Sequence, residues 1–382
     1  MNKGLVNHVS QKFQQVFDQD PILVFSPGRI NLIGEHTDYN DGFAFPAAVD
    51  KGIVLAIQKK QSGDSSVYAL DQEERYDFGH EQLHPLISGG WRNYILGIVA
   101  ELKIRGFSAG GFDAVFAGDI PMGAGMSSSA ALENAFVFGL NYLFGLGLDR
   151  DEMILISQMA EHNYAKVKCG IMDQYASMFG VKNSALLLDC RSVSSRSFRI
   201  DLKDYGLLLI NSNVKHDLSE SAYNDRRAVC EKVSKLLHVK ALRDVTLEDL
   251  EALKSKLSKR DFQKALYVLQ ENKRVIAFSE SIVNTDLKEL GKLLIESHEG
   301  LSKQYEVSCA ELDFLVDSIQ DNPNVLGGRM MGGGFGGCTI NLVRKESIQE
   351  LKEDVQRKFE IKFERKCSFY EVNLSQGTHL IN

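Results

Sequence analysis

The chain has 382 residues, a length that predicts two domains and leaves room for a third. Its net charge of −7 lacks the basic excess of proteins that coat nucleic acids or membrane surfaces, so we expect neither partner. The apolar content of 44% is typical of folded globular proteins and argues against a mainly disordered chain. One feature is unusual, because the 32 glycines are clustered while only 6 prolines are present.

The cysteines indicate a reducing compartment. No two of them form a C-x-x-C pair, and a chain of this length can bury a core without disulfides, so we predict separate reduced thiols. The six are Cys169, Cys190, Cys230, Cys309, Cys338 and Cys367. The N-terminal residues lack the apolar core of a signal peptide, and no stretch approaches the ~20 apolar residues that span a bilayer. We therefore expect a cytoplasmic protein.

The first half of the chain alternates predicted helices and strands. Apolar residues at helical spacing predict a helix over 5–17, and the apolar run at 22–25 predicts a strand that ends at Ser26-Pro27-Gly28. In order, we further predict a strand at 53–57, a helix at 91–102, a strand at 112–116, a small-residue loop at 118–129, a helix at 130–144, another helix after 151, and strands at 185–188 and 207–210.

The residue composition changes near residue 205. Residues 217–300 are mostly charged helical sequence, and 327–337 hold seven glycines in eleven residues. A strand at 338–343, a helix at 346–358 and a strand at 368–373 follow. We therefore predict domains at 1–205 and 206–382. Strands and helices interleave with few long β-α-β units, which predicts an α+β fold with mixed sheets.

The segment PMGAGMSSSA at 121–130 joins a predicted strand to a long helix. Small residues let the backbone approach a ligand, and the first N–H groups of a helix lack internal partners, which favours a bound phosphate. The serine hydroxyls could cap the helix, contact a phosphate or hold magnesium. The simpler alternative is an N-cap with a tight turn, which needs fewer serines and glycines. The loop is not a P-loop, because no Gly-Lys-Ser/Thr follows.

The second glycine cluster, at 332–337, matches G-x-G-x-x-G. A strand is predicted after it, where a dinucleotide-binding turn would open a helix, and this context argues against a nicotinamide dehydrogenase. The run still implies close approach of the backbone to a ligand, a phosphate or a neighbouring loop. A turn packed against the other domain remains an alternative.

The segment GRINLIGEHTDYN at 28–40 places a dense set of polar residues after a short strand. Arg29, Glu35, His36 and Asp38 offer donors and acceptors suited to a polyhydroxylated ligand, although each alone is more often structural. A metal site at His36 is disfavoured, since no second histidine lies within ligand spacing.

Asp173 follows a glycine break between two helical stretches, in CGIMDQ at 169–174. A carboxylate there can simply complement the helix dipole. Beside a substrate hydroxyl, it could instead orient that hydroxyl or accept its proton.

Together these segments resemble the galactokinases, within the GHMP family of small-molecule kinases. GRINLIGEHTDYNDG at 28–42 is similar to the galactokinase signature, PMGAGMSSSAALE at 121–133 to the family's phosphate loop, and GGRMMGGGFGGCTINLV at 327–343 to its third motif. CGIMDQ and KHDLSESAYNDRR at 215–227 also match galactokinase stretches, and the resemblance covers about residues 20–380. Two departures are Met126, where leucine is usual, and Met331, where threonine is common.

The resemblance implies a two-domain GHMP kinase fold with the active site in the cleft between the domains, the second being ferredoxin-like. It implies that ATP phosphorylates the anomeric hydroxyl of galactose, the first step of galactose catabolism, with Mg²⁺ as the metal and a monomer as the working unit. Asp173 would orient or deprotonate the hydroxyl, and Arg29 would stabilise charge on the transferred phosphoryl group.

The residues implied by the resemblance form three groups. The sugar pocket would comprise Arg29, Glu35, His36, Asp38, Gly170, Asp173 and Tyr223. The nucleotide site would comprise Trp91 and Tyr94 at the adenine, and Gly123, Ala124, Gly125, Met126, Ser127, Ser128 and Ser129 at the phosphates. The magnesium ligands would be Ser129 and Glu161.

Two other functions stay open from the sequence. A non-catalytic sensor of galactose and ATP could share the fold, but the intact serines at 127–129 and Asp173 favour an enzyme. A related kinase acting on N-acetylgalactosamine or arabinose is the second alternative.

Overall fold

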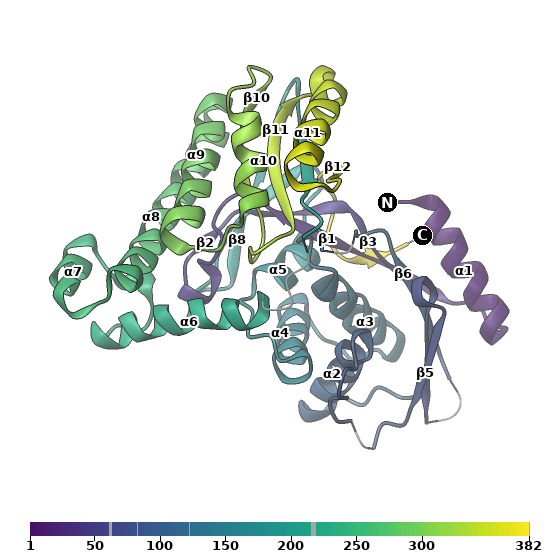
Figure 1. The fold of residues 1–382 in the computed structure, drawn as a ribbon. Coiled ribbons are helices and arrows are strands. Elements are labelled where there is room, and N and C mark those ends of the chain that lie inside the picture. The colour runs from purple at the N-terminus through teal and green to yellow at the C-terminus, as the bar shows by residue number, and fades with distance from the viewer. Residues whose placement is uncertain (61–62, 82, 122, 215–218, 382) are drawn as a thin grey trace.

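The computed structural model describes residues 1–60, 63–81, 83–121, 123–214 and 219–381, with side chains described except at 219–223. Within these residues the chain forms three β-sheets flanked by helices, which confirms the predicted α+β fold (Figure 1). No helix in this described part is long and apolar enough to cross a membrane.

The largest sheet buries both of its faces. Along β3 the residues alternate, so that Ile53, Leu55 and Ile57 join one hydrophobic cluster while Val54 and Ala56 join another on the opposite side. The strand order is β13-β1-β3-β6-β4-β5. The bounds are β1 (Ile22–Asn31), β3 (Pro46–Lys59), β4 (Ser65–Ala69), β5 (Glu74–Phe78), β6 (Phe112–Gly118) and β13 (His379–Leu380).

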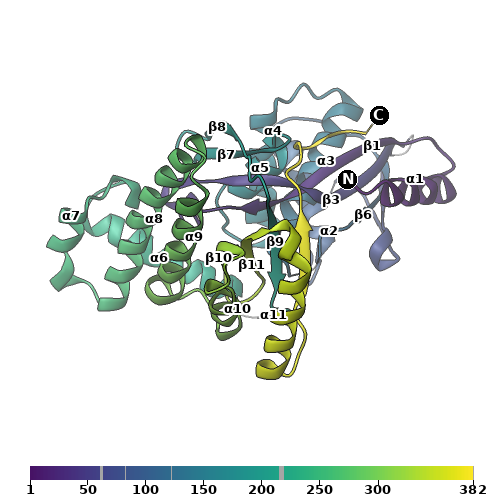
Figure 2. The same cartoon turned by 90° about the horizontal axis from the view of Figure 1, so that it is seen from above.

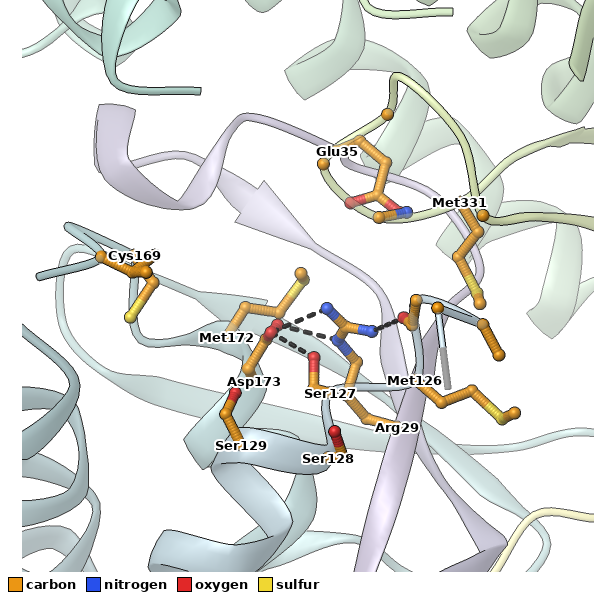
Figure 3. A pocket seen from close by; sticks show the side chains of 18 of the residues that line it. Arg29, Glu35, Met126, Ser127, Ser128, Ser129, Cys169, Met172, Asp173 and Met331 are labelled. Carbon is orange, nitrogen blue, oxygen red and sulfur yellow. Dashed lines mark hydrogen bonds and ion pairs between the residues drawn. The ribbon is translucent and has the colours of Figure 1, made fainter. Parts of the chain in front are cut away.

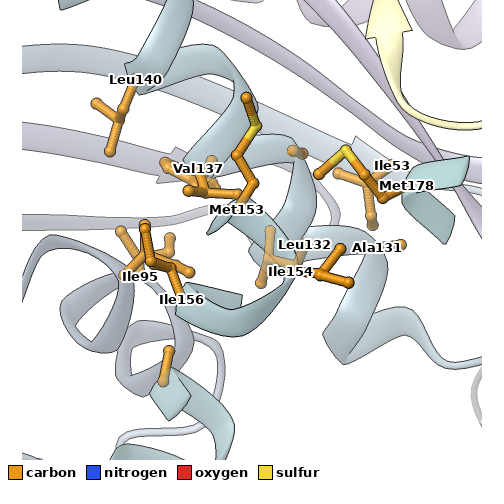
Figure 4. Close-up of a cluster of buried hydrophobic side chains, with 14 of the residues drawn as sticks. Ile53, Ile95, Ala131, Leu132, Val137, Leu140, Met153, Ile154, Ile156 and Met178 are labelled. Atoms are coloured by element: carbon orange, nitrogen blue, oxygen red, sulfur yellow. The ribbon is translucent and has the colours of Figure 1, made fainter. Parts of the chain in front are cut away.

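Four helices cover one face of this sheet and α1 (Lys3–Phe17) covers the other (Figure 2). The four contribute a continuous set of buried apolar side chains, including Leu132, Val137 and Leu140 (Figure 4). Burial of this set against the sheet holds the four helices on that face. They are α2 (Trp91–Ile104), α3 (Ser128–Phe144), α4 (Arg150–Ala160) and α5 (Met172–Phe179).

Strand β1 is longer than predicted. The sequence predicts a strand over 22–25, but pairing with β3 continues to Asn31 through a register shift between Pro27 and Arg29. The predicted stop at Ser26-Pro27-Gly28 is therefore wrong, because the irregularity absorbs the proline without ending the strand. As a result, Arg29 sits on a rigid strand and not on a loop.

The second half of the chain carries a four-stranded antiparallel sheet of order β10-β11-β9-β12. Leu208 and Ile210 pack under two helices on one face, while Leu207 and Leu209 face a core that also contains Ile30 from β1. This shared core joins the two halves. The bounds are β9 (Tyr205–Asn211), β10 (Val325–Met330), β11 (Cys338–Arg344), β12 (Ser368–Val372), α10 (Ala310–Gln320) and α11 (Ile348–Phe363).

The charged region after residue 217 is helical, as predicted. A separate hydrophobic cluster, with Tyr267, Tyr305 and Val233 at its centre, holds most of these helices together. They are α6 (Ser219–Leu236), α7 (Leu247–Ala252), α8 (Lys259–Val283) and α9 (Leu287–Glu299), followed by a π-helical turn, η6 (Gly300–Tyr305). A small sheet of β2 (Phe43–Ala44), β7 (Ser184–Asp189) and β8 (Ser194–Arg199) lies beside them.

Two features of the glycine-rich and C-terminal regions differ from expectation. Gly327 and Gly328 belong to β10, where a Cβ on Gly327 would lie 2.1 Å from the carbonyl oxygen of Gly291, so close packing excludes a side chain there. The chain end returns to the first half, where β13 pairs with β1.

All six cysteines are free, which confirms the predicted separate thiols.

Candidate active site

A cleft of about 620 Å³ lies where the two halves of the chain meet. Most of its walls come from the end of β1 with the polar segment after it, the loop before α3, residues 161–173, and the glycine run that precedes β11 (Figure 3). Tyr94 of α2 and Val214 complete the lining. The described lining residues include Arg29, Glu35, His36, Asp38, Tyr94, Gly123, Ala124, Gly125, Met126, Ser127, Ser128, Ser129, Glu161, Asp173, Met331 and Phe335. Most of the predicted site residues thus share one cavity.

A bidentate ion pair occupies the floor of the cleft. Arg29 donates from Nε to Asp173 Oδ1 and from Nη2 to Asp173 Oδ2, both at 2.7 Å. Its third nitrogen donates to the carbonyl oxygen of Gly125, and the Ser127 hydroxyl donates to Asp173 (Figure 3). Burial alone would lower the pKa of Arg29, but the charges of Asp173 and Glu35 raise it above its ordinary value. The guanidinium is therefore a fixed positive charge beside the loop.

The loop before α3 is built for close backbone approach. Gly123, Gly125 and Ser127 all have positive φ, at 69°, 67° and 52°. The backbone N–H of Arg29 donates to Met126 O at 3.1 Å, which ties the loop to β1. Helix α3 begins at Ser128, two residues earlier than predicted, so its free N–H groups face the cleft. The positive end of the helix, the serine hydroxyls and Arg29 are together suited to an anion, which makes this loop a candidate anion site.

The glycine run at 332–337 lies against this loop. A Cβ on Gly337 would approach Gly123 O at 3.2 Å, and one on Gly332 would lie 3.7 Å from Gly125 Cα. Strand β11 follows the run, as the sequence predicts, so the G-x-G-x-x-G match does not open a helix. The run therefore completes the wall beside the candidate anion site.

The polar segment after β1 supplies three predicted site residues. The Glu35 carboxylate accepts from the Gly332 N–H at 2.7 Å and is only 2% exposed. His36, with a φ of 61°, is 3% exposed. Burial, and then the charge of Asp173, raise the pKa of Asp38 to about 7. These groups place donors and acceptors on one side of the Arg29–Asp173 pair.

Gly170 packs directly on Asp38. A Cβ at position 170 would lie 1.9 Å from Asp38 Oδ2, so a larger residue would displace that carboxylate. The absence of a side chain at Gly170 therefore allows the Asp38 carboxylate to keep its position in the cleft wall.

Ser129 and Glu161 meet at the opposite end of the loop. The Ser129 hydroxyl donates to Glu161 Oε1 at 3.1 Å, and the Gln174 amide donates to Glu161 Oε2 at 2.7 Å. Burial, and then the charge of Asp173, raise the pKa of Glu161 to about 7. No cluster of three or more His, Cys, Asp or Glu residues is arranged to hold a metal within the described ranges.

Two aromatic residues predicted near the adenine have different positions. Tyr94 lines the cleft, whereas Trp91 packs against Phe116 at 5.3 Å between ring centroids and donates from Nε1 to Glu74 at 3.2 Å. Trp91 is thus a core residue and is not among the described residues that line the cleft. Tyr223 lies on α6, and its side chain falls outside the described part of the structure.

Sequence reasoning missed one buried charge at the site. Arg329 is 0% exposed and donates to the Glu35 carboxylate at 3.2 Å and to Leu32 O at 2.8 Å. The available signal was an arginine flanked by glycines and methionines in GGRMM, where a charge is out of place unless it is paired. Gln174, which holds Glu161, had no comparable signal.

Comparisons with known proteins agree with this geometry. The galactokinase galactose-binding signature matches residues 11–59, and the N-terminal and C-terminal domain models of GHMP kinases match 93–181 and 278–361. A galactokinase of Thermotoga neapolitana is 39% identical over 94% of this chain and 99% of its own length. One of Clostridium tetani is 36% identical over 100% of this chain and 99% of its own.

Solved structures give the same result. The Lactococcus lactis galactokinase complexed with galactose superimposes with a TM-score of 0.94 at 32% identity, covering 97% of this chain and 98% of that one. A mevalonate kinase shares the fold, with a TM-score of 0.65 at 19% identity over 92% of this chain and 99% of its own. The fold is thus the two-domain GHMP kinase fold, and the chain belongs to the galactokinase family.

Proposed function

We propose that this protein transfers the γ-phosphoryl group of ATP to the anomeric hydroxyl of galactose, producing galactose 1-phosphate and ADP. The observation that carries the proposal is the Arg29–Asp173 pair, which lies in the cleft beside the loop that begins α3. Phosphoryl transfer requires positioning and charge neutralisation more than covalent help from the protein. A carboxylate, a guanidinium and a helix N-terminus in one cleft supply both.

Asp173 orients the anomeric hydroxyl and accepts its proton as the hydroxyl oxygen bonds to the γ-phosphorus. The bond between the γ-phosphorus and the bridging oxygen breaks, and ADP leaves with that oxygen. Arg29 donates to the equatorial phosphoryl oxygens, where negative charge accumulates. The bidentate geometry supports this division, because the pair fixes both side chains before substrate arrives.

The loop residues Gly123–Ser129 hold the phosphates through backbone N–H groups and hydroxyls. Tyr94 provides an aromatic surface for the adenine, and Trp91 supports that wall from the core. On the other side of the pair, Glu35, His36, Asp38, Gly170 and Tyr223 form the sugar pocket. Their placement follows the family signature, and four of the five are described in or next to the cleft.

Ser129 and Glu161 are the residues that would hold Mg²⁺. A hydroxyl beside one carboxylate suits an ion that keeps several waters and takes its other ligands from phosphate oxygens. Such an ion would neutralise charge on those phosphates. The raised pKa of Glu161 fits a carboxylate that needs a cation to stay ionised.

We also propose a division into domains at 1–205 and 206–382, with a ferredoxin-like second domain. All four strands of the second sheet follow residue 204, which supports the boundary, although β13 returns to the first sheet. A cytoplasmic monomer is the corresponding working unit, and six free cysteines are typical of a reducing compartment.

Turnover with a panel of sugars tests the proposed function. Coupled detection of ADP release should show activity with galactose and little with N-acetylgalactosamine, glucose or mevalonate. Equal activity with N-acetylgalactosamine would contradict galactose as the specific substrate. Galactose binding without ADP release from any of them would identify a sensor and refute the kinase.

Asp173→Asn should lower kcat by at least ~100-fold, because the amide cannot accept the hydroxyl proton. The fold should persist, as thermal unfolding would show. Asp189→Asn is the matched control, since Asp189 forms a similar two-point pair with Arg243 outside the cleft. Near-normal turnover of Asp173→Asn, or an equal loss in the control, would contradict the role of Asp173.

The free energy of unfolding of Glu161→Gln should rise relative to that of the metal-free wild type as the pH increases from 4.5 to about 7. The folded pKa of Glu161, about 7, exceeds its ordinary value of 4.5, so the folded wild type keeps a proton that the unfolded chain has lost between these values. Wild-type stability should fall in that window by about 1.4 kcal/mol per pH unit relative to the variant. Urea unfolding of both proteins at pH 5.5, 6.5 and 7.5 measures the difference, and a constant difference would contradict it.

A further inference from the structure

Helix α8 holds the backbone of the polar segment after β1. The Glu271 carboxylate accepts from the Gly34 N–H at 3.0 Å, and the Tyr267 hydroxyl donates to the Glu35 carbonyl oxygen at 3.0 Å. Glu271 and Tyr267 are four residues apart, so they share the helix face that meets this segment. Both residues are fully buried. One helix face therefore holds two consecutive residues of the segment.

The same helix also holds the chain further along. Asn272 Oδ1 accepts from the Phe43 N–H at 2.8 Å. A Cβ on Gly42 would lie 2.4 Å from that oxygen, so the chain passes directly over Asn272. Residues 34–43, which we call the sugar segment, are thus anchored at both ends by neighbouring residues of α8. Three of the predicted sugar-pocket residues lie between the two anchors.

The first anchor is also closely packed. Gly34 has a φ of 93°, and a Cβ there would lie 2.7 Å from Phe43 O and 2.8 Å from Val275 Cγ2 on α8. The Gly34 backbone therefore lies between the helix and the end of the sugar segment. Its bond to Glu271 determines where the segment starts.

Glu271 is a carboxylate buried among charged and polar partners. Arg274 Nε donates to its Oε2 at 2.6 Å, and the Ser297 hydroxyl on α9 donates to its Oε1 at 2.7 Å. Burial alone would lower the pKa of Arg274, but the charge of Glu271 raises it above its ordinary value. The bond from Gly34 is therefore charge-assisted and stronger than a bond between neutral groups.

A purely structural role for Glu271 is the alternative, in which it joins α8 to α9. Its bonds to Arg274 and Ser297 stay within these two helices, whereas its bond to Gly34 crosses to the segment that follows β1. The two roles predict different results, because only the second bond leads to the cleft.

We propose that Glu271 is a positioning residue for the sugar site, which holds Gly34 so that the sugar segment keeps its place in the cleft wall. Tyr267 and Asn272 assist it from the same helix. An interaction that holds the sugar equally before and during phosphoryl transfer changes KM and leaves kcat unchanged. The identity of the sugar rests on the proposed function, whereas the anchoring of residues 34–43 does not.

Glu271→Gln tests this role in the full-length protein. An amide has one acceptor oxygen, so either the Gly34 N–H or Arg274 would then face an NH2 group. Loss of a charge-assisted bond should raise the KM and Kd for galactose about ten- to hundredfold. Both kcat at saturating galactose and the KM for ATP should stay within about threefold of wild type. Steady-state kinetics and calorimetry measure these values.

Ser297→Ala is the matched control. It removes a bond to the same carboxylate oxygen but leaves the bond from Gly34 in place. Its galactose Kd should stay within about threefold of wild type.

A second pair of variants keeps the test decisive where Glu271→Gln fails to fold. Asn272→Leu removes the acceptor for the Phe43 N–H, whereas Asn272→Asp keeps an oxygen there. We expect Asn272→Leu to raise the galactose Kd about three- to tenfold and Asn272→Asp to keep it near the wild-type value. Equal values for the two variants would contradict the second anchor.

Hydrogen exchange gives a measurement that does not depend on turnover. Glu271→Gln should speed the exchange of backbone amides in residues 34–43 and leave those of α3 unchanged, because the lost bond frees only the sugar segment.

The outcomes separate the two proposals. An unchanged galactose Kd in folded Glu271→Gln, an equal loss in Ser297→Ala, or a loss in kcat alone would refute the positioning role. Galactose binding by the wild type without ADP release would refute the proposed kinase. Weaker galactose binding and faster exchange in Glu271→Gln would then still support the role of Glu271. If the wild type binds no galactose, the proposed function fails and exchange at 34–43 decides the anchor.

Discussion

The ion pair between Arg29 and Asp173 is the interaction on which the site depends. It joins strand β1 to the first turn of α5, and it also holds the loop between them through Gly125 and Ser127. Two charges removed from water are costly unless their geometry is good, and here two parallel hydrogen bonds of 2.7 Å compensate. The pair therefore positions three separate segments at the point where phosphoryl transfer is proposed.

A second buried arginine performs a related task between the two halves. Arg329 on β10 reaches across to Asn31 O and Leu32 O at 2.5 and 2.8 Å, and to the Glu35 carboxylate. Because Glu35 also holds Gly332, the polar segment after β1 and the glycine run form one unit. The cleft is thus pre-organised from both sides, which lowers the entropic cost of arranging two substrates.

Much of the site could be predicted from local sequence, because its chemistry is concentrated in short segments. The serines at 127–129 and the glycines around them indicate a helix N-terminus suited to an anion. Asp173 follows a glycine that interrupts two helical stretches. The α+β class followed from interleaved elements. The position of Trp91 was harder to predict, since the sequence pattern around an aromatic residue does not distinguish a pocket lining from a packed core.

The parts that could not be predicted depend on tertiary contacts. Strand β8 lacks alternating burial, and β13 spans two residues. Strand β10 contains two glycines that are explained only by tertiary contacts, of Gly327 with Gly291 and of Gly328 with Asn341 and Ile319. The Tyr39 and Tyr305 hydroxyls are 266 positions apart in the sequence but lie 2.7 Å from each other, and no spacing rule could reveal that contact. The role of Arg329 likewise depends on its contact with Glu35, which is far away in the sequence.

A crystal structure with galactose and a non-hydrolysable ATP analogue would show directly whether Asp173 and Arg29 face the reacting groups. We expect the anomeric oxygen within about 3 Å of the Asp173 carboxylate, with the γ-phosphate between Arg29 and the start of α3. An anomeric hydroxyl directed away from Asp173, or a γ-phosphate beyond reach of Arg29, would contradict this expectation.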